Sequence, residues 1–148
     1  MVTIGNLLPL VFDTAGAGEL FLLGRLLFGG VLAFMGLNHF MNADMMVPYS
    51  EAKGVPAAGL MVPFTGGLLL FGGLSVIAGA YVVVGAGGLA VFLVSSAVLM
   101  HDFWAVGEEE QMTEMTQFLK NMVMAGGALA FLALAGETWP YAANVGLF

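Results

Sequence analysis

The chain has 148 residues, of which 60% are hydrophobic and only 9% are charged, and its mean hydropathy is +0.99. Because soluble domains carry about 25% charged residues, this composition excludes an ordinary water-soluble globule. The net charge of −7, with only three basic residues, excludes a nucleic-acid partner, since phosphate binding requires clustered lysine and arginine. The length predicts one membrane domain over residues 1–148. The absence of cysteine excludes disulfides and thiolate metal sites.

The segments expected outside the membrane are acidic. They contain Asp44, Glu51, Glu108, Glu109, Glu110 and Glu114. Acidic, lysine-poor surfaces suit a cell with concentrated internal salt, where screening relieves self-repulsion, so we hypothesise a halophilic source. The stretch Met1–Asp13 carries no Arg or Lys, and Pro9 interrupts its apolar run. We interpret it as a peripheral leader before the first span and not as a signal peptide.

Four apolar segments are long enough to cross a bilayer, which requires about 20 helical residues. They are residues 19–41, 57–80, 81–103 and 115–136. The valine-rich start of the third segment resembles a strand. However, its apolar run continues to Leu99, and an open strand in lipid would leave its backbone unsatisfied. The sequence therefore predicts an all-α, polytopic membrane protein that forms an antiparallel four-transmembrane-helix bundle.

The connections between the spans predict how the bundle is oriented. A tight turn at residues 78–82 makes the second and third spans an antiparallel hairpin. Both termini then lie on one side, and the two longer loops, residues 42–56 and 105–114, lie on the other side, which we call the polar end. Small residues recur at helical spacing, as in Gly29-xxx-Ala33, Ala86-xxx-Ala90 and Gly126-xxx-Ala130. In lipid, such spacings allow close helix approach, so we expect a tightly packed bundle.

Polar side chains inside membrane helices are costly, so their positions carry information. Arg25 precedes His39 by 14 residues, about 21 Å of helix, and therefore lies toward the terminal side. Polar residues from three spans instead share the level of the polar end. They are Asn38, His39, His101, Asp102, Gln117, Lys120 and Asn121. The last three have i, i+3, i+4 spacing and share one helical face. The sequence predicts one polar site built by three spans.

Sequence spacing also predicts which of these groups pair. If the third span reaches residue 103, His101 and Asp102 point about 100° apart and do not pair with each other. We expect Asp102 to pair with Lys120, and His101 to face His39, Asn121 or the lumen of the bundle. His101 and Asp102 are the candidate catalytic residues. The candidate ligand pocket comprises Asn38, His39, Trp104, Gln117, Lys120 and Asn121.

Structural interpretations compete with these functional ones. The residues 101–104 would form an aromatic interface belt, and Lys120 would extend to lipid headgroups. For Arg25 we expect a structural anchor, paired with Glu19 or Glu137 near its own side.

Several motifs carry a family resemblance. They are Leu23–Gly29, Gly36–Phe40, Tyr49–Pro56, His101–Trp104 and Gln117–Asn121. In order and spacing, over residues 20 to 135, they resemble the DoxX family of small four-helix membrane proteins. The resemblance implies a four-span membrane protein of bacteria or archaea. Its relatives include a subunit associated with a terminal quinol oxidase and a subunit of thiosulfate:quinone oxidoreductase. It implies no agreed set of catalytic residues.

We consider first a quinone-linked, redox-associated subunit. His101 would accept a quinol proton, Asp102 with Lys120 would form a local charge pair, and Asn38 or Asn121 would bind a carbonyl oxygen. Phe103 and Trp104 would flank the ring. Because electrons would still need another carrier, the chain would be one part of an oxidoreductase, with quinone as its ligand and no cofactor of its own.

The alternative is a non-catalytic structural or assembly subunit of a larger membrane complex, in which the polar end is a structural lock. A transporter ranks third, because four spans are few and no inverted repeat is evident. His39 and His101 share one level but lack a third ligand, so no metal site is predicted. We expect the protein in the cell membrane, in contact with the lipid bilayer, as a homo-oligomer or within a membrane redox complex.

Overall fold

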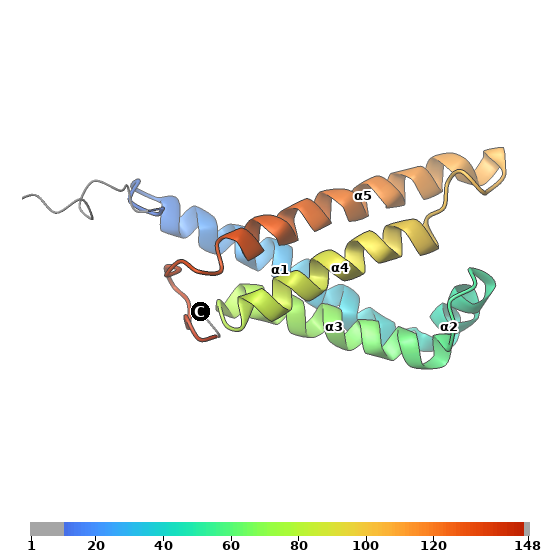
Figure 1. Ribbon diagram of the computed structural model, residues 1–148, viewed down its shortest axis with the longest axis horizontal. Coiled ribbons are helices and arrows are strands. Elements are labelled where there is room, and N and C mark those ends of the chain that lie inside the picture. The colour runs from blue at the N-terminus through green and yellow to red at the C-terminus, as the bar shows by residue number, and fades with distance from the viewer. Residues whose placement is uncertain (1–10, 147–148) are drawn as a thin grey trace, which may run out of the picture.

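The computed structural model describes residues 11–146, which form an all-α structure (Figure 1). The helices are α1 (Ala17–Met41), α2 (Ala43–Ala52), α3 (Ala58–Ala78), α4 (Val82–Met100) and α5 (Glu108–Ala133). Within the described residues, the only β pairing is an isolated bridge between Ala80 and Val145. The first ten residues of the expected N-terminal leader lie outside this range.

Three helices, α1, α3 and α4, are long and apolar enough to cross a membrane. This finding confirms a helical protein that passes through the membrane several times. Helix α5 has 26 residues but is not among the three, because charged and other polar side chains, including Gln117, Lys120 and Asn121, lower its hydropathy. The fourth span therefore remains a prediction, to which we return below.

Two loops differ from the expectation. Helix α5 begins at Glu108, seven residues before the expected start of the span at Met115, and its first turn holds three glutamates that the helix dipole stabilises. Residues 43–52, expected to lie in a loop, form α2 even though Pro48 lies inside that helix. Hydropathy marks lengths that span lipid, so it does not detect a short helix lying at the membrane surface.

The predicted hairpin between the second and third spans is confirmed. Helix α3 ends at Ala78 and α4 begins at Val82. Gly79 and Tyr81 adopt left-handed φ angles of 62° and 53°, which reverse the chain within three residues. The Ser75 hydroxyl donates a hydrogen bond to the carbonyl oxygen of Ala80 and closes the turn.

Helices α1 and α3 pack with their backbones in contact. A Cβ atom added to Gly29 would overlap the carbonyl oxygen of Gly73, and one added to Gly73 would overlap that of Gly29. Nearer the polar end, a Cβ atom added to Gly36 would overlap the carbonyl oxygen of Gly66 in the same way. The expected close approach is therefore present here. It is absent at Gly126, where an added Cβ would meet nothing within 4 Å.

The four long helices form two pairs, α1 with α3 and α4 with α5, which converge at one end of the molecule and spread apart toward α2 (Figure 1). Aromatic rings join the pairs at the converging end. Phe21 and Phe28 of α1 lie 5.7 and 5.1 Å, centroid to centroid, from Phe131 of α5. Both ends of the described chain lie at this converging end, as predicted for the termini. The spread end is the polar end.

Candidate functional site

A cavity of about 1110 Å³ lies between the two helix pairs at the polar end. All five helices contribute to its wall, which is mainly apolar. Its polar side chains include His39, Ser50, Thr65, Ser95, Ser96, His101, Thr116, Gln117, Lys120 and Asn121. Several apolar residues of the wall, such as Val91 on α4 and Val123 on α5, are also exposed on the bundle surface. The cavity therefore opens through the sides of the bundle as well as at its end.

His39 lies on the α1 wall of this cavity. Its Nδ1 lies 2.8 Å from the carbonyl oxygen of Met35. A carbonyl oxygen only accepts, so Nδ1 carries the hydrogen in this contact, and Nε2 remains as an acceptor. The ring of Phe92 on α4 packs edge-on at 6.3 Å. His39 is thus a positioned hydrogen-bond acceptor on an apolar wall.

His101 also lines the cavity, but α4 ends at Met100, so His101 and Asp102 follow the helix instead of belonging to it. Nδ1 of His101 lies 2.8 Å from a carboxylate oxygen of Glu114 on α5. Both side chains are largely buried. The sequence predicts His39, Asn121 or the lumen as the surroundings of His101 and does not predict Glu114, because it places residues 105–114 in a loop.

The expected ion pair between Asp102 and Lys120 is wrong. Asp102 accepts a hydrogen bond of 2.6 Å from Nζ of Lys53, which follows α2. This bond lowers the pKa of Asp102 and raises the pKa of Lys53 relative to their ordinary values. Because α2 was read as part of a loop, sequence spacing gave no reason to place Lys53 beside the end of α4.

The polar face of α5 meets the cavity as its spacing predicts. Gln117, Lys120 and Asn121 all lie on the cavity wall. Asn121 is only 7% exposed, and its amide donates a hydrogen bond of 3.4 Å to the hydroxyl of Ser96 on α4. Lys120 belongs to neither of the ion pairs found among the described residues. Its ammonium is therefore available to a ligand in the cavity.

Two residues of the expected pocket lie outside the cavity. The amide oxygen of Asn38 accepts a hydrogen bond from Asn42, which joins α1 to α2. Trp104 is 56% exposed and packs with Phe103 and Phe118 in an aromatic cluster. This placement suits an aromatic belt at the membrane surface.

Tyr49 on α2 is a cavity residue that sequence analysis did not select. Burial, followed by the negative charge of Glu114, raises the pKa of its phenol above the ordinary value. Together with Lys53, Asp102, His101 and Glu114, it forms a network that joins α2, the end of α4 and α5. We call these five residues the polar network. Only the helical character of α2 would have identified Tyr49 beforehand.

Arg25 differs from its expected structural role in one respect. Within residues 11–146 it forms an ion pair with neither Glu19 nor Glu137. It donates instead to a backbone carbonyl in the C-terminal segment, at the end opposite the cavity.

The fold and the cavity together define the class of this molecule, an all-α membrane protein that crosses the bilayer several times and holds a side-opening cavity at one end. The sequence model of the DoxX family matches residues 20–102, more than half of the chain. The chain therefore belongs to the DoxX family. No curated protein and no solved structure matches it. The matched region contains His39, His101 and Asp102, and it ends before the polar face of α5.

Proposed function

We propose that this protein binds a quinone in the polar-end cavity and serves as a quinone-linked subunit of a membrane redox complex. The observation that carries the proposal is the combination of a large, mainly apolar cavity with a few polar side chains in its wall. Ligand pockets of this kind are mainly apolar, with a few polar groups that orient the ligand. A quinone has the same division, a polar head and an apolar tail.

The quinone head would lie between α1 and α5. Nε2 of His39 would accept a hydrogen bond from a quinol hydroxyl. The ammonium of Lys120 and the amide of Asn121 would donate to a quinone carbonyl oxygen from the opposite wall. The tail would lie against apolar wall residues such as Met35 and Met124. The openings through the bundle sides would admit the ligand directly from lipid.

The polar network would carry the quinol proton away from the cavity. His101 lines the cavity and would accept the proton. Glu114, hydrogen-bonded to the His101 ring, would pass it toward the polar end. Asp102 would orient this region through Lys53 and would not itself touch the ligand. Because the sequence contains no cysteine, we expect the electron carrier to belong to a partner.

We further propose that α5 is the fourth span. From Met115 to the end of α5 at Ala133, Lys120 is its only charged residue. The four acidic residues before Met115 would lie in the headgroup region of the polar end. Helix α5 also packs along α4, which is apolar enough to cross the membrane. This arrangement completes the antiparallel four-helix bundle over a single membrane domain.

Quinone retention tests the ligand. The protein would be extracted from quinone-containing membranes, and the bound quinone would be measured by chromatography. We expect roughly one quinone per wild-type protein. In Lys120→Met the quinone content should fall about tenfold or more, which corresponds to a loss of about 1.4 kcal/mol of binding free energy. The matched control is Asp44→Ala, which removes an exposed charge outside the cavity.

The His101→Ala variant tests the proton acceptor. We expect reduced quinone content, or, in the assembled complex, a changed pH dependence of quinol turnover. Unchanged quinone content together with an unchanged pH profile would remove the proposal.

A specific observation favours the alternative of a non-catalytic assembly subunit. Gly126 and Ala130 on α5 are exposed and face away from the other helices, so this small-residue motif could receive a helix of another subunit. Under this alternative, Gly126→Leu would abolish co-purification with a redox complex while quinone retention stays unchanged. Isolation of the wild type from native membranes as a partner-free monomer would contradict it.

A further inference from the structure

The end of the molecule opposite the cavity contains a fully buried cation. Arg25 on α1 is 0% exposed, and its guanidinium packs against two aromatic rings that also contact each other. The carbon atom Cζ is 5.4 Å from the centroid of Phe21 and 5.5 Å from that of Trp139. These contacts stabilise the charge only in part, because the rings supply no hydrogen-bond acceptor in the plane of the guanidinium.

The hydrogen-bond donors of Arg25 are incompletely used. Nη2 donates to the carbonyl oxygen of Tyr141 at 2.8 Å. Nε and Nη1 are buried and have no partner in the described residues. A buried donor without an acceptor is costly, and a buried charge without a counter-charge is more costly still. The site therefore lacks an anionic acceptor.

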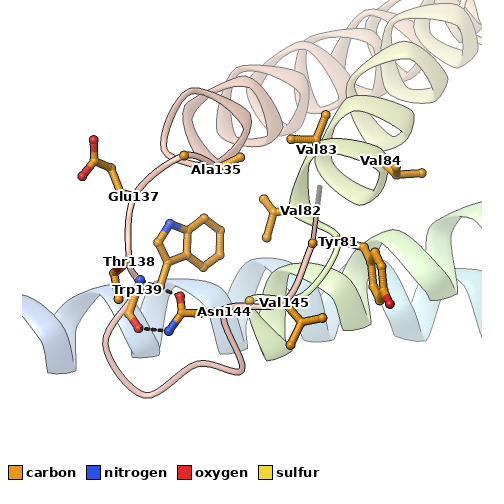
Figure 2. Close-up of a pocket in the computed structure, with 13 residues that line it drawn as sticks. Tyr81, Val82, Val83, Val84, Ala135, Glu137, Thr138, Trp139, Asn144 and Val145 are labelled. Atoms are coloured by element: carbon orange, nitrogen blue, oxygen red, sulfur yellow. Dashed lines mark hydrogen bonds between the residues drawn. The ribbon is translucent and has the colours of Figure 1, made fainter. Parts of the chain in front are cut away.

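The nearby carboxylates do not fill this role. Glu19 accepts a hydrogen bond of 2.8 Å from the hydroxyl of Tyr141, and its side chain is exposed. The side chain of Glu137 points away from the indole of Trp139 (Figure 2). Asp13, at the same end, is exposed as well. Since exposed charges are screened by solvent and salt, none of the three neutralises Arg25.

Residues 137–146, which we call the C-terminal lid, cover Arg25. The lid is attached to the α3–α4 turn by two backbone hydrogen bonds, from Ala143 to the Ala78 oxygen at 2.8 Å and from Tyr81 to the Val145 oxygen at 2.7 Å. Tyr141 and Asn144 have left-handed φ angles of 52° and 51°, which are unfavourable for tyrosine but tolerated by asparagine. Further hydrogen bonds hold the lid closed, from the Trp139 indole to the Leu134 oxygen and from the Tyr141 hydroxyl to Glu19.

A pocket of about 200 Å³ lies between the lid and the start of α4, and Trp139 forms part of its wall (Figure 2). Gly79 lies at the boundary between this pocket and the arginine. A Cβ atom on Gly79 would be 3.2 Å from the ring of Trp139 and 3.3 Å from Nη1 of Arg25. Displacement of Trp139 would therefore join the pocket to Nη1 of Arg25.

We propose that Arg25 is the centre of a phosphate-binding site that opens when the C-terminal lid lifts, and that its ligand is the phosphate of an anionic lipid. Arginine binds phosphate through two parallel N–H groups, and Nε forms such a pair with Nη2, which is released when the lid lifts and takes the Tyr141 carbonyl with it. Trp139 and Tyr141 lie at this end of the bundle, in the manner of aromatic residues at headgroup level. The proposal concerns the end opposite the cavity and does not depend on quinone binding.

The chain offers a direct probe of the lid, because it has only two tryptophans, Trp104 and Trp139. In a Trp104→Phe protein all tryptophan fluorescence comes from Trp139, which is 2% exposed. The protein would be placed in nanodiscs of phosphatidylcholine alone, in the same discs with inorganic phosphate, and in discs of phosphatidylcholine mixed with phosphatidylglycerol. The readouts are the emission maximum and quenching by acrylamide.

We expect a red shift and stronger quenching in discs that contain phosphatidylglycerol. We expect neither change in phosphatidylcholine alone, because its own choline group neutralises the phosphate. Adding Arg25→Gln should abolish the response, whereas Lys120→Gln, the same charge loss at the other end, should retain it. A response to inorganic phosphate alone would support the phosphate site and overturn the lipid as its source. A response that survives Arg25→Gln would overturn the proposal. Identical fluorescence in all three discs would overturn it as well, and this comparison keeps Arg25 intact, so it does not depend on whether Arg25→Gln folds.

Discussion

Lys53 and Asp102 are 49 positions apart in sequence, yet their side chains meet at 2.6 Å across the end where the two helix pairs spread apart. Lys53 follows α2, which packs against α3, and Asp102 follows α4. The ion pair therefore links the two pairs at the mouth of the cavity. Its partner contact, between His101 and Glu114, links the end of α4 to α5.

This link should depend on pH at both extremes. Lys53 lowers the pKa of Asp102, so the stabilisation is present above the unfolded value, about 3.9, and is lost as pH falls through the lower folded value. The pKa of Lys53 is raised, so its contribution is present below about 10.4 and is lost as pH rises through the folded value.

We expect the distance between spin labels on α2 and α5 to stay constant at intermediate pH and to lengthen in acid. The Lys53→Met protein should show the longer distance at every pH. Lys120→Met serves as the control, because its charge takes no part in the link. A wild-type distance between the labels that does not change in acid would contradict the role of the Lys53–Asp102 pair as a link.

A second prediction concerns Tyr49. Burial is the largest cause of its raised pKa, and the charge of Glu114 is the next. Replacing Glu114 by Gln removes the second cause and leaves the first, so the pKa of Tyr49 should fall but stay above its ordinary value of about 10.

The measurement is an ultraviolet titration of tyrosinate in a protein whose other two tyrosines, Tyr81 and Tyr141, are phenylalanine. Glu51→Gln provides the control, since it removes a carboxylate that does not affect the Tyr49 pKa. Equal titration curves for Glu114→Gln and its parent would show that the network does not extend to Tyr49.

The membrane-spanning helices could be predicted from hydropathy, because a span needs an apolar stretch of a certain length and its backbone must be hydrogen-bonded within the helix. The same reasoning placed polar residues of three spans at one level, and His39, His101 and Lys120 do lie around one cavity. Their functional roles remain predictions, since neither the fold nor the DoxX match tests them.

The pairing of side chains could not be predicted, because it depends on helix ends. Because α4 ends at Met100, Asp102 lies outside the helix. Its side chain is therefore not on the helix face that would have brought it to Lys120. Helix α2, which has no hydropathy signal, brings Lys53 to the same place. Local capping and surface packing decide such boundaries, and they shift by a few residues without changing the apolar pattern.

The close packing of α1 and α3 gives a stability prediction. A methyl group on Gly73 would overlap the Gly29 carbonyl and lie 2.7 Å from the Ala33 nitrogen. Since both neighbours are backbone, Gly73→Ala must move the helices apart, at an expected cost of about 1–3 kcal/mol. Gly30→Ala, where the added carbon meets nothing within 4 Å, should be neutral or slightly stabilising. Thermal unfolding in detergent compares the two, and equal stabilities would contradict backbone contact at Gly73.

The last prediction separates the volume of the cavity from its polar chemistry. Ser96 lies on the α4 wall and accepts a hydrogen bond from Asn121. Phenylalanine at this position would project a ring into the cavity while leaving His39, His101 and Lys120 unchanged. We expect the quinone content of Ser96→Phe to fall about tenfold or more below that of the wild type. A tenfold fall corresponds to a loss of about 1.4 kcal/mol of binding free energy.

The control for this variant is Ser96→Ala, which removes the same hydroxyl without filling space. If the cavity is the quinone site, Ser96→Ala should retain far more quinone than Ser96→Phe, while both keep the helical content of the wild type. Equal quinone retention by both variants and the wild type would place the ligand elsewhere on the molecule. Equal loss in both variants would instead assign the effect to the hydrogen bond that positions Asn121 and not to the volume of the cavity.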